Sequence, residues 1–143
     1  MVALTAGRNT PQAIADDRSG LLGASQAIFA GSILMRNASG HLIKGATAVG
    51  SFGVGRAEEA VTSTTAGVTP IAYKPGVYRY ANSSAGDLIV TADIGAACYI
   101  VDDQTVAKTN GTSTRSIAGI IDNVDAQGVW VRFDEALARA FLS

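Results

Sequence analysis

The sequence predicts a mainly β protein with a single folded domain. From Leu21 onward, short apolar runs of strand length alternate with clusters of Gly, Ser, Asn and Asp, which is the pattern of an all-β domain. The 143 residues are enough for one domain with a substantial core. No linker and no internal repeat divides the chain, so we expect one β-rich domain over residues 21–143.

The first twenty residues predict an N-terminal arm. The segment "MVALTAGRNTPQAIADDRSG" is polar and weakly periodic, with one proline and four charges. A segment of this kind has little apolar surface to bury on its own. We expect residues 1–20 to order against a partner, and the alternative is a simply disordered terminus.

Two segments near the start of the domain predict three strands. "AIFAGSILMRNASGHLIKGA" (residues 27–46) predicts two strands joined across residues 37–40, whose small polar side chains favour a turn. "VGRAEEAV" (residues 54–61) alternates small apolar with polar residues, as in a half-exposed strand. The glycines of "GSFGVGRAEE" (residues 50–59) indicate a turn that enters this strand, because the segment lacks the Lys-Ser/Thr pair of a phosphate-binding P-loop.

Pro75 and Gly76 are the favoured central pair of a type II turn. In the strand that follows, Val77 and Arg79 should face one side, and Tyr78 and Tyr80 the other.

Three further short strands are expected before the next turn. They are "DLIV" (residues 87–90), "ACYIV" (residues 97–101) and "TVAKT" (residues 105–109). Asn110 and Gly111 follow them as a strong local turn signal.

The segment "GIIDNVDAQGVWVRF" (residues 119–133) predicts a β-hairpin with a three-residue loop that ends at Gly128. The corresponding register places Asp122 directly opposite Arg132, a cross-strand ion pair worth about 0.2–1 kcal/mol. This register also gives the hairpin one apolar face, formed by Ile121, Val129, Val131 and Phe133. The aspartate then has a structural role that needs no substrate.

The tail "DEALARAFL" (residues 134–142) predicts a short C-terminal helix. Asp134 is a suitable N-cap, and Glu135 favours the first turn. Leu137 and Phe141 lie four residues apart, on one side of the helix.

Composition argues against several classes of function. A net charge of −1 gives no basic field for nucleic acid or an anionic membrane. The longest apolar-rich run is about half the length that spans a bilayer, and no secretory signal is visible. With one histidine, His41, and one cysteine, Cys98, no clustered metal site, cofactor or catalytic dyad is expected. The charged fraction of 16% is low against about 25% in typical domains, which favours a surface covered by other chains.

One short segment resembles an enzyme motif. "AGIIDNVDAQG" (residues 118–128) is similar to the motif of the trimeric dUTPases in which an aspartate activates water, and "DRSG" (residues 17–20) faintly resembles another motif of that family. Residues 124–126 provide no tyrosine to stack on the sugar. The C-terminal segment also lacks the glycine-rich sequence that closes over the phosphates.

A much longer stretch resembles the capsid cement (decoration) proteins of tailed bacteriophages. The resemblance runs from "ALTAGRNTP" to Phe133, and "GRAEE", "DIGAACYIVDDQTVAKT" and "GVWVRF" are its most specific elements. It implies a small β-barrel or β-tulip-like domain that binds the outside of the phage head. The chain would be a non-enzymatic virion protein, made in the host cytoplasm, that cements major capsid protein subunits, commonly as a trimer and in some related phages as a dimer. The tail after Asp134 departs from the family pattern.

The resemblance also suggests where the contacts lie. We expect the arm to contact the capsid through Arg8, Asn9, Thr10 and Pro11. Tyr78, Tyr80 and Trp130 are the expected contacts with a neighbouring subunit. A structural protein of the tail or of the head–tail junction is the alternative within the same class, and a small nucleic-acid-binding barrel is a further one.

Overall fold

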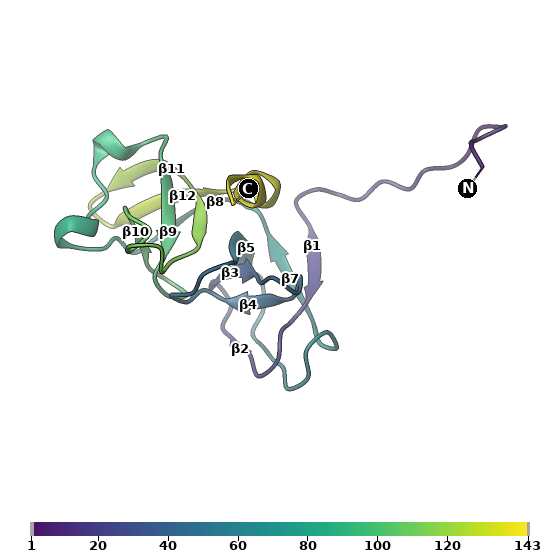
Figure 1. Ribbon diagram of the computed structural model, residues 1–143, viewed down its shortest axis with the longest axis horizontal. Coiled ribbons are helices and arrows are strands. Elements are labelled where there is room, and N and C mark those ends of the chain that lie inside the picture. Colours follow the sequence, from purple (N-terminus) through teal and green to yellow (C-terminus); the bar gives the residue numbers. More distant parts are fainter. Residues whose placement is uncertain (1, 143) are drawn as a thin grey trace.

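The structure is a computed structural model that describes residues 2–142, and it is mainly β (Figure 1). Met1 and Ser143, the outer ends of the expected arm and domain, lie outside the described residues. The strands are β1 (Arg18–Leu21), β2 (Ala27–Ile28), β3 (Ile33–Arg36), β4 (Leu42–Lys44), β5 (Phe52–Ala57), β6 (Val61–Thr62), β7 (Pro70–Lys74), β8 (Gly76–Tyr80), β9 (Ala97–Ile100), β10 (Val106–Ala107), β11 (Ile117–Asp125) and β12 (Gly128–Phe133). Two 3₁₀ turns, η1 (Ala85–Asp87) and η2 (Thr91–Asp93), and the helix α1 (Glu135–Phe141) complete the fold.

Ten of the strands form one mixed sheet. Its main path runs β1-β7-β5-β11-β12-β8, while β3 and β4 branch from β5, and β9 and β10 branch from β11. Strands β2 and β6 form a separate two-stranded ladder. The large sheet does not close into a barrel, since its path ends at β1, which pairs with β7, and at β8, which pairs with β12.

The core consists of two apolar clusters. One lies under β8, β9, β11 and β12, and the other under β4, β5, β7 and α1. The first contains the predicted apolar face of the hairpin, which is confirmed because Ile121, Val129, Val131 and Phe133 are all buried. Cys98 lies in the same cluster, where burial raises the pKa of its thiol to about 12.

The two strands predicted across residues 37–40 are confirmed as β3 and β4. The turn is held by Asn37, whose side-chain oxygen accepts hydrogen bonds from the backbone N–H groups of Ser39 and His41. The strand predicted in "VGRAEEAV" is β5, but it is mostly buried rather than half-exposed. It lies inside the sheet, paired with β3, β7 and β11, and it packs against the core and helix α1.

Pro75 and Gly76 do not form the expected type II turn. Gly76 has φ +136°, whereas the third residue of that turn requires about +80°. The pair is instead a break between two strands with different partners, since β7 pairs with β1 and β5 while β8 pairs with β12. The predicted alternation beyond it is confirmed, with Val77 and Arg79 exposed and Tyr78 and Tyr80 directed inward.

The segment "DLIV" is not a strand, although β9 and β10 lie where the next two were expected. The side chain of Asn82 donates to the carbonyl of Ile89 at 2.9 Å and accepts from its N–H at 3.0 Å. These bonds satisfy the backbone N–H and C=O groups of Ile89, which would otherwise need to pair with a neighbouring strand. The turn at Asn110 and Gly111 is present, and it continues through two more residues with positive φ, Thr112 and Ser113.

The β11–β12 hairpin has a different register from the predicted one. Its loop has two residues, because Asp125 pairs with Gly128 and accepts backbone hydrogen bonds from Gln127 and Gly128. Asp122 then falls in a β-bulge, and Arg132 lies opposite Ile120. The predicted cross-strand pair of Asp122 and Arg132 is therefore wrong. The bulge keeps the aspartate out of the core and places Ile121 opposite Val131.

Helix α1 is confirmed, with its predicted cap. The Asp134 carboxylate accepts from the Leu137 N–H at 3.1 Å. Ala138 is the residue that the helix buries, and Leu137 and Phe141 are about half exposed.

Candidate functional site

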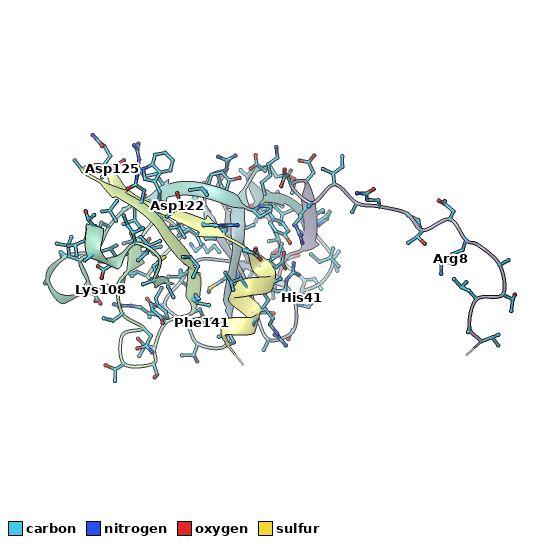
Figure 2. The ribbon with its side chains drawn as sticks, turned by 90° about the horizontal axis from the view of Figure 1, so that it is seen from above. Arg8, His41, Lys108, Asp122, Asp125 and Phe141 are labelled. Carbon is cyan, nitrogen blue, oxygen red and sulfur yellow. The ribbon has the colours of Figure 1, made fainter. Side chains whose placement is uncertain are left out.

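The N-terminal arm is extended and exposed. Residues 2–17 leave the body at β1 and run away from it on one side (Figures 1 and 2). Strand pairing begins at Arg18, so residues 18–20 of the predicted arm belong to the sheet. The apolar side chains of the arm are uncovered, with Val2 93%, Leu4 70% and Ile14 72% exposed.

The arm carries the expected capsid contacts far from the rest of the molecule. Arg8, Asn9, Thr10 and Pro11 are all exposed, and Arg8 lies well outside the body in Figure 2. The base of the arm is fixed by Lys74, whose ammonium lies 3.5 Å from the Asp17 carboxylate.

A second exposed surface lies on β8 and β12, and it contains one of the three predicted neighbour contacts, Trp130, whereas Tyr78 is directed to the inner face. Trp130 lies opposite Arg79, and Arg132 lies opposite Val77. Directly opposed residues share a face of the sheet, so these four side chains form a two-by-two grid on the outer face. We call this grid, together with the free edge of β8, the β8 surface.

Trp130 is held in place from two sides. Its indole N–H donates to Asp125 at 2.8 Å, and the Arg79 guanidinium lies 5.5 Å from the centre of its ring. The hydrogen bond from the indole, followed by the bonds from the turn backbone, holds the pKa of Asp125 below its usual value. The only tryptophan of the chain is therefore a fixed, partly exposed ring, of the kind enriched at interface hot spots.

An open hollow of about 300 Å³ runs along the edge of β8. Its far wall is formed by Gly31 and by Arg56, whose guanidinium lies 4.2 Å above the Tyr78 ring and 2.8 Å from the Glu58 carboxylate. Tyr80, the third predicted contact, is only 8% exposed and donates to the Gly31 carbonyl. It supports the hollow from below, as part of the core.

One exposed aromatic near this hollow was not predicted. Phe29 is 68% exposed in the turn that leads to Gly31, where its carbonyl accepts from the Ser32 N–H. Phe29 lies within the apolar segment "AIFAGSILM", and an apolar segment predicts burial. The sequence therefore does not indicate that this ring is on the surface.

A larger groove of about 680 Å³ lies between the base of the arm, α1 and the start of β8. The Glu135 carboxylate fixes one wall of it, accepting from Arg36 at 2.8 Å, Tyr73 at 2.6 Å and Arg18 at 3.3 Å. Arg132 and Arg139 also line the groove. These contacts tie the helix to β1, β3 and β7.

The side chains that could bind a metal ion lie apart from one another within the described residues. No group of three or more His, Cys, Asp or Glu side chains lies close enough to hold a metal ion within residues 2–142. Asp122, the aspartate of the dUTPase-like segment, is exposed in the bulge. Among the described helices, none has the length and apolar character needed to cross a membrane.

Comparison of the chain with protein-family models, with curated proteins and with solved structures gives no match.

Proposed function

We propose that this chain is a structural virion protein that binds the outer surface of a tailed-phage head and cements neighbouring major capsid protein subunits. The exposed arm is the observation that carries the proposal. Sixteen residues, 2–17, extend from a β body with their apolar side chains uncovered. Such an arm gains buried surface only when a partner covers it.

The β body supports the same proposal. Cement proteins of the family that the sequence resembles have a small β-barrel or β-tulip-like domain, and we propose that this fold is a variant of it. Two isolated bridges, Leu22 with Leu42 and Ala81 with Thr105, link strands across gaps between the branches of the sheet. With these two bridges, strands of the open sheet are linked in part as they would be in a closed barrel.

The mechanism is mechanical. One copy contacts one capsid subunit through the arm and a neighbouring subunit, or a second copy in a trimer, through its body. Many such bridges around a shell sum their contributions, so each contact can be weak. Ordering the arm opposes binding entropically, which its apolar contacts must offset.

Deletion of residues 2–14 tests the proposal. This deletion leaves β1, Asp17 and the Lys74 contact in place, so the body should keep its unfolding temperature. Undecorated heads should co-sediment with the full chain and lose at least about tenfold in affinity for the deleted chain. Full binding by the deleted chain would show that the arm is not the anchor.

Point variants locate the anchor within the arm. Arg8→Ala and Pro11→Ala should each weaken co-sedimentation with heads. Gln12→Ala, a matched change at another exposed position of the arm, should leave it unchanged. Equal weakening by all three variants would contradict the assignment of Arg8 and Pro11.

A further inference from the structure

The outer edge of β8 has unpaired backbone groups. Ala81, the residue after β8, donates to the Gln104 carbonyl at 2.8 Å and accepts from the Val106 N–H at 3.0 Å, while β12 pairs with the other side of the strand. Backbone groups of alternate residues in a strand point to the same side. The N–H and C=O groups of Val77 and Arg79 therefore also point away from β12. Within residues 2–142, no strand lies beside them.

This edge is accessible. The hollow bounded by Gly31 and Arg56 lies along it, and residues 104–106 continue the sheet past Ala81 for one bridge only. An edge of this kind is a template for an added strand. Backbone hydrogen bonds hold an incoming strand, and its alternate side chains enter the flanking hollows.

The charges on the β8 surface select the partner. Among the described residues, no carboxylate forms a salt bridge with Arg79 or Arg132. Glu58 is paired with Arg56, whereas Asp125 is bonded to the neutral indole of Trp130 and offsets one of the two arginine charges. Although the chain as a whole has a net charge of −1, this surface has an excess of positive charge.

The same charges argue against a second copy as the occupant. Antiparallel pairing of two β8 edges would place the two Arg79 side chains either directly opposite or diagonal to each other, and like charges that are directly opposed are destabilising. The arm of a second copy is also a poor fit, since its only carboxylates, Asp16 and Asp17, lie at its base, where Asp17 contacts Lys74 of its own body. An extended segment of another protein with acidic side chains fits both the backbone edge and the charges.

We propose that the β8 edge is a strand-acceptor site for an extended acidic segment of a partner protein. The segment pairs with the backbone of Val77 and Arg79 and places carboxylates beside Arg79 and Arg132. The inference extends the proposed function by naming the chemistry of the second contact, and it rests on that function only for the identity of the partner.

A peptide titration tests the site without phage heads. The probe is acetyl-Thr-Val-Glu-Val-Glu-Val-Thr-amide, added to the full ¹⁵N-labelled chain. We expect saturable shifts of amide resonances in residues 76–80 and 129–132, and slower hydrogen exchange at Val77 and Arg79. The peptide with both glutamates replaced by lysine should bind about tenfold more weakly.

Variants separate the site from nonspecific charge effects. Arg79→Glu should weaken the acidic peptide about tenfold, and Arg132→Glu should also weaken it. Lys44→Glu makes the same charge change at an exposed position of β4 and should leave affinity unchanged. The unfolding temperature of each variant verifies that its fold is intact.

Four results would overturn the proposal. They are an absence of binding up to millimolar peptide, equal binding of the lysine peptide, shifts confined to other strands, and equal affinity of Arg79→Glu. Dimerisation of the full chain with protection of the same amides would instead assign the edge to a second copy. None of these measurements uses phage heads. Peptide binding can therefore fail while arm-dependent binding to heads succeeds, and head binding can fail while peptide binding succeeds.

Discussion

The indole N–H of Trp130 donates a 2.8 Å hydrogen bond to the carboxylate of Asp125, which also accepts from the backbone N–H groups of Gln127 and Gly128. One side chain thus closes the hairpin loop and fixes the orientation of the ring on the β8 surface. The contact links the local geometry of a turn to the proposed interface.

This contact predicts a pH-dependent fluorescence change. The pKa of Asp125 is held below its ordinary value of 3.8, so its contribution to stability is present above that value and is lost as the pH falls through the lowered pKa. Fluorescence of the single tryptophan should change with a midpoint below 3.8. Asp125→Ala should abolish the transition and Asp122→Asn should retain it. A transition that survives in Asp125→Ala would contradict the assignment.

Glu135 should contribute strongly to stability. Its side chain is 18% exposed and accepts hydrogen bonds from Arg18, Arg36 and Tyr73. We expect Glu135→Ala to lower the free energy of unfolding by about 2–3 kcal/mol in urea denaturation, because it leaves Arg36 partly buried and without its charge partner. Tyr73→Phe removes two hydrogen bonds, one donated to Glu135 and one accepted from Arg36, but no charge, and should cost about 1–2 kcal/mol. Equal effects of both variants would show that the charge makes no contribution.

Gly119 should not tolerate a side chain. A Cβ at this buried position would overlap the backbone carbonyl of Arg132 on the neighbouring strand. Gly119→Ala should therefore destabilise the protein by about 1–3 kcal/mol, as overpacked sites do. Gly86→Ala is the matched control, since no atom lies within 4 Å of a Cβ there. Similar unfolding temperatures for the two variants would contradict the close approach of β11 and β12.

Asp122 and Arg132 should show no energetic coupling. They are not paired across the hairpin, because the bulge removes Asp122 from the ladder. A double-mutant cycle with Asp122→Ala and Arg132→Ala should give a coupling free energy near zero. A directly opposed ion pair would give about 0.2–1 kcal/mol, and a value in that range would restore the unbulged register.

The hairpin shows what the sequence could and could not predict. The apolar face of β12 follows from simple alternation, which does not depend on the loop. The register depends on loop length, and Asp125 forms a two-residue loop that shifts the pairing by one. The bulge at Asp122 then shifts the pairing again, so that the side chain of Ile121 points into the core. Two local irregularities left the burial pattern as predicted and changed every cross-strand pair.

Contacts made by residues outside each segment explain the other differences. "DLIV" has the composition of a strand, but Asn82 satisfies the backbone of Ile89 from seven residues away. Tyr78 and Trp130 could be selected from sequence as candidate contacts because they are aromatic. The free edge beside them could not, since the position of β8 at the end of the sheet is set by residues distant in the sequence.

Electron cryomicroscopy of undecorated phage heads incubated with the full chain tests the central claim most directly. We expect regular density on the outer surface of the capsid, with the arm lying on one major capsid subunit and the β body reaching its neighbour. Density at the tail or the head–tail junction, or heads that remain bare at saturating protein, would contradict it.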